Sequence, residues 1–287
     1  MKKAIGTIIG SLIFILIILA VFSSIFFITE QMFNLFSNQI TKLSFESEKQ
    51  SEKLEIISSA FNKYLPKRFL ISAAASSSGN IFSLIKPLDD NYLTLTAIRP
   101  VATYITNVTF NFEEIEPVDP MGEIRISIVF SYDISTPLTQ NVYILNRFTN
   151  SWDLVDTSSF STDVLFSQKV ITVTTPDNYI FPNGTVKVQI FASASVVFKA
   201  YYDYISLKIE NSDTNNIAVT YILNNSPFSS KIVSVVVFNS TTFQREDLNI
   251  TIPSSSLFLI KIKTDIINSN IKFITDLGNI FQATISN

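Results

Sequence analysis

The sequence predicts an α+β chain: a long N-terminal membrane-spanning helix followed by mainly antiparallel β structure in two sandwich domains. Three observations support this prediction. Residues 4–29 form one uncharged apolar run. A heptad pattern of apolar residues then continues almost to Pro66. After Pro66, short runs rich in Val, Ile, Thr, Tyr and Phe are separated by Asn, Asp, Pro and Ser, which is typical of strands and turns.

The apolar run is long enough to cross a lipid bilayer. A hydrocarbon core of ~30 Å needs ~20 helical residues. Lys2 and Lys3 precede the run, and no Lys or Arg follows before Lys42. Because positive charge favours the cytoplasmic side, we expect a single-pass protein of the cell membrane with its N-terminus in the cytoplasm and its bulk outside.

Composition excludes several functional classes. The net charge is -3, so no basic field is available for nucleic acid, and none is expected as a partner. The chain contains neither Cys nor His, which removes thiolate nucleophiles and the commonest general base and metal ligand. Adjacent Glu113 and Glu114 are expected on opposite faces of a strand. We therefore expect no enzyme, no catalytic residue, no cofactor and no metal site.

The first residues resemble a known processing signal. The order Met1-Lys2-Lys3-Ala4-Ile5-Gly6-Thr7 before the apolar run resembles the class III signal of archaeal type IV pilins and archaellins. The resemblance implies cleavage after Ala4 or Gly6, with the apolar helix retained for assembly. The chain lacks the glutamate that bacterial members have at the fifth mature position.

Two alternatives for this segment stay open. A secretory signal peptide has an apolar core of only ~7–15 residues, so this run is too long for one, although residues 20–24 offer a weak cleavage site. An uncleaved signal anchor fits the same residues. Whether the segment is a pilin-like signal or an uncleaved signal anchor, residues 1–29 comprise the Lys pair and the apolar membrane-spanning helix.

A heptad-patterned helical stalk is predicted for residues 30–66. Its seam has apolar residues at most positions, with Ser47 and Gln50 in the middle, and Pro66 ends the pattern. Such a seam indicates helix association with other copies, a coiled-coil oligomer or packing on the chain's own domain. The predicted association residues are Phe36, Ile40, Leu43, Leu54, Ile57, Phe61 and Tyr64.

A linker over 67–87 and a first sandwich over 88–210 are predicted next. Residues 72–80, SAAASSSGN, are small and polar, which favours a linker or an exposed turn. Seven strands are expected beyond it, in residues 92–98, 103–114, 123–134, 142–147, 164–174, 185–192 and 195–209.

The first sandwich resembles galactose-binding-like, discoidin-like jelly rolls of archaeal surface proteins. The resemblance rests on the strings at 142–155 and 184–190 and on Tyr201-Tyr202-Asp203-Tyr204. Trp152 is interpreted as a core aromatic, with a sugar-stacking platform as the alternative. Asp203 is interpreted as a structural carboxylate. Asp89 and Asp90 lack the spaced oxygen ligands of a recognisable calcium motif.

A polar break at 210–216 separates the second predicted sandwich, residues 211–287. Five strands in these 77 residues favour an immunoglobulin-like arrangement. The strings at 231–235, 242–247 and 272–281 resemble the C-terminal β-domain of archaeal pilin-like and archaellin-like proteins. Leu277 replaces the Arg that is usual in that family, and Gly278-Asn279 supports a tight turn.

Glycosylation sequons number about as many as chance gives for this composition. All lie on the side predicted to be external, at Asn107, Asn183, Asn224, Asn239 and Asn249.

The features together predict a non-enzymatic structural or adhesion protein of the cell surface. The first hypothesis is a type IV pilin-like subunit or minor pilin that self-associates through its N-terminal helix, as in a surface filament. The alternative is a signal-anchored extracellular protein whose jelly roll binds carbohydrate or a protein partner.

Overall fold

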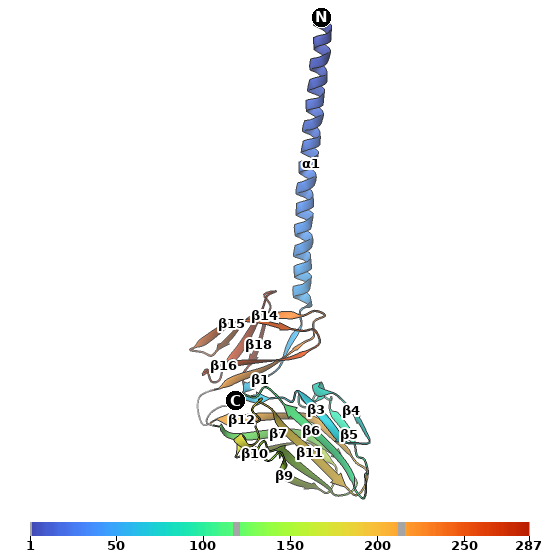
Figure 1. Ribbon diagram of the computed structural model, residues 1–287, viewed down its shortest axis with the longest axis vertical. Coiled ribbons are helices and arrows are strands. Elements are labelled where there is room, and N and C mark those ends of the chain that lie inside the picture. Colours follow the sequence, from blue (N-terminus) through green and yellow to red (C-terminus); the bar gives the residue numbers. More distant parts are fainter. Residues whose placement is uncertain (1, 117–120, 212–215, 287) are drawn as a thin grey trace. The chain divides into compact units, whose positions relative to one another are not determined.

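The computed structural model describes residues 2–116, 121–211 and 216–286 and contains one long helix followed by β structure (Figure 1). The chain forms two compact units. One contains residues 1–52 with 276–279, and the other, called the β unit below, contains residues 53–275 with 280–287. The strands are almost entirely antiparallel. The α+β prediction is confirmed at this level.

The helix α1 spans Lys2–Ser51 and is a candidate single membrane span or signal anchor. At 1.5 Å per residue it is about 75 Å long, more than twice a hydrocarbon core. Its large apolar side chains from Leu12 to Phe45 are exposed. Ala4 and Gly6 have helical backbone, but their side chains lie outside the described residues. Cleavage there stays a prediction.

Residues 276–279 form a turn at the C-terminal end of α1. The Asn279 side-chain amide donates to the Lys49 carbonyl oxygen at 2.8 Å and to the Glu52 carboxylate at 2.9 Å. The last carbonyl oxygens of a helix have no partner within the helix, so these bonds stabilise its end. Gly278 has φ +79°, as the expected Gly-Asn turn requires.

The helical stalk predicted to residue 66 is wrong beyond Ser51. Residues Leu54–Phe61 form strand β1 and Lys63–Tyr64 form β2. The spacing of three and four residues arises because β1 has buried side chains on both faces and carries a bulge between Ile56 and Ser58. Consequently four predicted association residues lie in the β unit, three of them buried and one half-buried: Leu54, Ile57, Phe61 and Tyr64.

Four sheets make up the β unit, and the names A to D are kept below. Sheet A has the order β1-β13-β16 and sheet D the order β15-β14-β17-β18. Sheet B has the order β10-β7-β12-β5-β4, with β2 also paired to β12, and sheet C the order β3-β6-β11-β8-β9. The remaining bounds are β3 Arg68–Ala73, β4 Ser76–Ser78, β5 Leu93–Thr96, β6 Tyr104–Phe112, β7 Met121–Asp133, β8 Leu138–Leu145, β9 Trp152–Phe160, β10 Val164–Val173, β11 Val186–Ala194, β12 Lys199–Asn211, β13 Ile217–Asn224, β14 Ser230–Phe238, β15 Phe243–Ile252, β16 Leu257–Lys263, β17 Asn270–Thr275 and β18 Ile280–Thr284.

Sheets B and C enclose the first core. Alternating residues of β6, β7, β8, β11 and β12 point inward and are fully buried. Tyr132 and Tyr202 lie in this core, and the Tyr132 hydroxyl donates to Gln140 Oε1 at 2.5 Å. This bond pairs the Tyr132 hydroxyl with the amide oxygen of Gln140 inside a mainly apolar interior, while Gln140 Nε2 has no partner among the described residues.

Sheets A and D enclose the second core. Its buried residues come from β13 to β17 and also from β1, which contributes Leu54 and Phe61. The second sandwich therefore begins before the first in sequence, and the first sandwich is inserted between β1 and β13.

Strand β13 is buried on both faces, since residues 217–222 are all buried. Ala218 and Ile222 belong to the second core, while Val219 and Tyr221 belong to the first. Between them, the hydroxyl groups of Thr220 and Ser59 are bonded at 2.9 Å. One strand thus joins the two cores, and each face needs its own apolar set.

The predicted boundaries differ from the structure in two further places. The linker expected at 67–87 contains β3, the edge strand β4 and the short 3-10 helix η1, Ile81–Leu84. Strands β9 and β18 are absent from the sequence prediction, because their mixed polar residues give weak alternation. Part of the polar break at 210–216 lies outside the described residues.

We expect Tyr221→Phe to lower the free energy of unfolding by about 1–3 kcal/mol. The Tyr221 hydroxyl accepts a hydrogen bond from the Leu65 N–H at 2.8 Å, and Leu65 is buried, so the substitution leaves that donor unpaired. Urea denaturation of the full chain in detergent measures the change. Tyr104→Phe, on a half-buried ring, is the control, and equal losses in both variants would contradict this role.

We also expect the β unit to lose stability between about pH 10 and 12. Burial raises the pKa of Tyr64 and of Tyr202 from 10.0 to about 12. The unfolded chain therefore releases these protons first, so the stabilisation is complete below pH 10 and is lost as pH rises through 12. Tyr202→Phe should flatten the pH dependence of the urea midpoint over this range. An unchanged slope would contradict the assignment.

Candidate functional site

The outer face of sheet C gathers amide and aromatic side chains. In β6, β8 and β11 the inward positions are apolar, or buried polar at Thr106 and Gln140. The outward positions alternate with them and are half-buried, apart from buried Thr109 and Leu145. The sheet thus has one face in the core and one facing outward.

The strand register brings the outward residues into rows across the sheet. One row contains Thr109, Gln189, Tyr143 and Leu154, and the next contains Asn107, Phe191, Asn141 and Thr157. Neighbouring strands lie ~4.8 Å apart, so side chains within a row are in contact range. We call the following set the amide–aromatic face: Asn107, Asn111, Asn141, Tyr143, Trp152, Gln189 and Phe191.

Hydrogen bonds orient part of this face. Thr157 Oγ1 donates to Asn141 Oδ1 at 3.0 Å, and Asn141 Nδ2 donates to the Tyr143 hydroxyl at 3.4 Å. Within the described residues, the Oδ1 atoms of Asn107 and Asn111 are buried and accept no hydrogen bond. These amides retain unused hydrogen-bonding capacity.

Charge is confined to one end of the face. Arg68 and Lys187 share a row with Asn111, and Arg68 Nη2 lies 2.8 Å from Glu113 Oε1. The residues that the register places on the two central rows are uncharged. The centre of the face is therefore neutral, with both donors and acceptors.

Trp152 lies on this outer face. It pairs with Leu145 at the first position of β9 and is half-buried. Neither core includes it among its buried or partly buried apolar residues. The interpretation of Trp152 as a core aromatic is wrong, because its position in the alternation of β9 faces away from the core.

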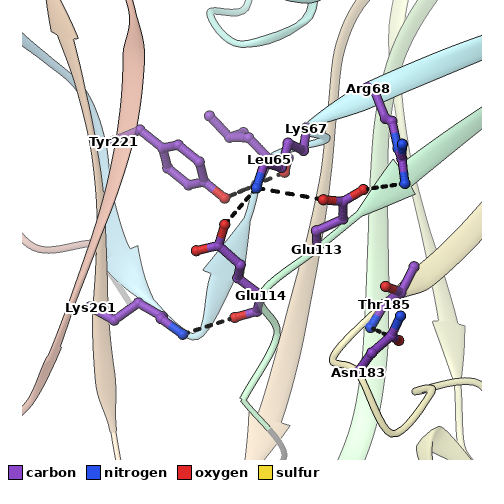
Figure 2. A network of polar contacts seen from close by, with 9 residues as sticks. All are labelled: Leu65, Lys67, Arg68, Glu113, Glu114, Asn183, Thr185, Tyr221 and Lys261. Carbon is purple, nitrogen blue, oxygen red and sulfur yellow. Dashed lines mark hydrogen bonds and ion pairs between the residues drawn. The ribbon is translucent and has the colours of Figure 1, made fainter. Parts of the chain in front are cut away.

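A cavity separate from the amide–aromatic face lies between the two sandwiches. A cavity of about 350 Å³ is lined mainly by apolar side chains, including Phe82, Leu257 and Phe258. Figure 2 shows its polar edge, where the Tyr221 hydroxyl meets the Leu65 backbone. Lys261 Nζ donates to the Glu114 carbonyl oxygen at 3.2 Å and pairs with Glu116 at 2.8 Å. These contacts hold the loop after β6 against sheet A.

Glu113 and Glu114 do not point to opposite faces. Strand β6 ends at Phe112, and Glu114 has φ +60°, so the backbone turns between them. Lys67 Nζ lies 3.5 Å from Glu113 and 2.6 Å from Glu114 (Figure 2). The hydrogen bond to Glu114 raises the pKa of Lys67. The pair is neutralised by Lys67 and Arg68.

The sequons differ in accessibility. Asn183 and Asn249 are exposed, and Asn239 is half-buried at a turn. Asn224 is fully buried and donates to the carbonyl oxygens of Phe228 and Ile252, so it is wrong as a glycosylation candidate. Asn107 lies on the amide–aromatic face.

The other predicted site residues are dispersed. Phe36, Ile40 and Leu43 are exposed on α1, whereas the other four predicted association residues lie in the β unit. Among the described residues, no group of three or more acidic side chains converges as a metal site.

Comparison with known proteins gives neither a family nor a curated relative: no protein-family model and no curated protein matches the chain. Similar solved structures include the carbohydrate-binding module TmCBM61 in complex with β-1,4-galactotriose, with TM-score 0.33, 10% identity and coverage of 50% of this chain and 90% of that one. A CBM4 module has TM-score 0.34, 11% identity and coverage of 50% and 94%. A family 29 carbohydrate-binding module from Piromyces equi has TM-score 0.28, 14% identity and coverage of 57% and 94%.

The amide–aromatic face is the part of the site that sequence reasoning missed. The strands at 142–147 and 185–192 were expected, and their outward positions include Tyr143, Gln189 and Phe191. The signal that could have found this face is an aromatic residue and an amide residue at the outward-facing positions of a strand whose apolar and polar residues alternate. The alignment of the rows depends on register, which a single sequence does not give.

Proposed function

We propose that this chain is a non-enzymatic, single-pass anchored surface protein whose first sandwich binds carbohydrate on the amide–aromatic face. The observation that carries the proposal is the set of half-buried aromatic and amide side chains in adjacent rows. The apolar helix α1 serves as the anchor. The Lys pair before it favours display of the sandwiches outside the cell.

The chemistry of the face suits a sugar. The ring of a hexose has apolar C–H patches that pack on aromatic side chains, and its hydroxyl groups both donate and accept hydrogen bonds. Tyr143, Phe191 and Trp152 provide aromatic surfaces, each held half-buried by neighbours. Asn141 and Gln189 can donate and accept at once, which matches a hydroxyl group.

The absence of charge in the central rows favours a neutral glycan. An acidic polysaccharide needs cations along its path, and here Arg68 and Lys187 occupy only one end. Glycoside hydrolysis needs two carboxyl groups flanking the bond. None of the described residues that register places in these rows is acidic, which supports binding without catalysis.

We expect Tyr143→Ala and Phe191→Ala each to weaken glycan binding about threefold to tenfold, because each removes a stacking surface. Affinity electrophoresis of the full chain in detergent against a β-glucan, a mannan and a galactan measures this loss. Phe243→Ala removes an aromatic ring that is 77% exposed on the second sandwich and is the matched control. Binding of wild-type strength in both face variants, or no binding of the wild-type chain to any of these polysaccharides, would contradict the proposal.

A type IV pilin-like subunit is a second candidate, supported by exposed apolar residues on α1 beyond the uncharged run. Phe33, Phe36, Ile40 and Leu43 follow the spacing three, four, three and are 58–73% exposed. An apolar seam of this spacing packs against another helix, and parallel copies in one membrane provide it.

Mass spectrometry of the N-terminal peptide separates the two candidates. A filament subunit should begin at Ile5 or Thr7 and be enriched in a sheared surface fraction. An anchored binding protein should begin at or next to Met1 and stay with the membranes, and that outcome excludes pilin-like processing.

A further inference from the structure

One oxygen of a buried carboxylate in β12 has no hydrogen-bond partner among the described residues. Asp203 is 1% exposed and lies between Tyr202 and Tyr204, at a bulge in the pairing of β12 with β7. The bulge places Asp203 outside the regular alternation of the strand. Its side chain therefore reaches the segment that precedes β5.

One oxygen of Asp203 is occupied and the other is free. Oδ2 accepts a hydrogen bond from the Leu88 N–H at 2.5 Å. Oδ1 is buried and has no hydrogen-bond partner among the described residues. No ion pair found in the described part of the chain includes Asp203. A buried carboxylate without a counter-charge is costly, so something else must neutralise it.

Two more carboxylates, those of Asp89 and Asp90, directly follow Leu88 in the sequence. Burial raises the pKa of Asp203, and the negative charges of Asp89 and Asp90 raise it further. The nearest cation along the chain, Lys86, pairs with Glu55 at 3.6 Å. Among the described residues no lysine or arginine forms an ion pair with Asp203, Asp89 or Asp90, so the chain's own cations do not balance their negative charge.

We propose that Asp203 Oδ1, together with oxygen atoms of the segment 88–91, binds a calcium ion. Since no three acidic side chains of the described residues converge on one point, at most two carboxylates bind the ion directly. Backbone carbonyl groups, the Asn91 amide and water supply the remaining ligands.

The available donors select calcium among common cations. Every candidate ligand is an oxygen atom, which suits a hard cation, and the chain has no His or Cys for zinc or copper. Calcium accepts irregular sets of six to eight oxygens, whereas magnesium demands near-octahedral geometry. A loop bonded to a buried strand residue provides an irregular set.

The bound ion would fasten the segment before β5 to β12. Leu88 and Asp90 both have positive φ, 59° and 61°, a backbone conformation that costs energy in residues other than glycine. The ion compensates this cost and the repulsion between the carboxylates. The site is therefore structural and separate from the amide–aromatic face.

Thermal unfolding of the full chain in detergent, after removal of metals with EDTA, tests this proposal. Adding calcium chloride to about 10 mM, roughly ten times or more the Kd typical of extracellular modules, should raise Tm by about 5 °C. Magnesium chloride at equal ionic strength should give a smaller rise.

Asp203→Asn should abolish the calcium-dependent rise while keeping or raising the Tm of the metal-free chain, because it removes the buried charge. The double variant Asp89→Asn/Asp90→Asn should reduce the calcium-dependent rise in Tm, and it tests the site if Asp203→Asn does not fold. Asp265→Asn, at an exposed aspartate of the second sandwich, is the matched control and should keep the full rise. No rise in the wild-type chain, or an equal rise in Asp203→Asn, would overturn the proposal and indicate that Asp203 is protonated instead.

Discussion

The arrangement of the β unit depends on strand β13, which is buried on both faces. One face packs into the second core and the other into the first, so a single strand belongs to two hydrophobic interiors. Its partner β1 comes from before the first sandwich in sequence. Loop closure over the inserted sandwich costs entropy, and burial of both faces of sheet A offsets that cost.

This constraint separates structural from functional surfaces. The apolar side chains that join the sandwiches come from sheet A and from the segment around Leu65, whereas the outer face of sheet C carries polar and aromatic residues that no core needs. In the first core the Tyr132 hydroxyl donates to Gln140 Oε1, whereas Gln140 Nε2 has no hydrogen-bond partner among the described residues. The Oδ1 atoms of Asn107 and Asn111 likewise accept no hydrogen bond from the described residues, and both amides belong to the outer face.

Local features of the fold could be predicted from the sequence, whereas features that depend on the register between strands could not. The uncharged run predicted α1, and clear alternation predicted most strands, such as β7 and β14. Residues 54–64 were wrongly assigned to a helix, because burial on both faces of β1 together with its bulge produces the spacing of three and four residues that a heptad also has. The row containing Tyr143, Gln189 and Thr109 joins three strands from distant parts of the chain. The same holds for Asp203 and Leu88, whose contact spans 115 residues.

The chain contains a single tryptophan, and it lies on the amide–aromatic face. Titration of its intrinsic fluorescence with neutral oligosaccharides therefore tests the proposed binding surface directly. We expect a saturable change in Trp152 emission, with a midpoint that moves to about threefold to tenfold higher oligosaccharide concentration in Tyr143→Ala. Saturable glycan binding without any change in Trp152 emission would place the binding surface elsewhere and contradict the account.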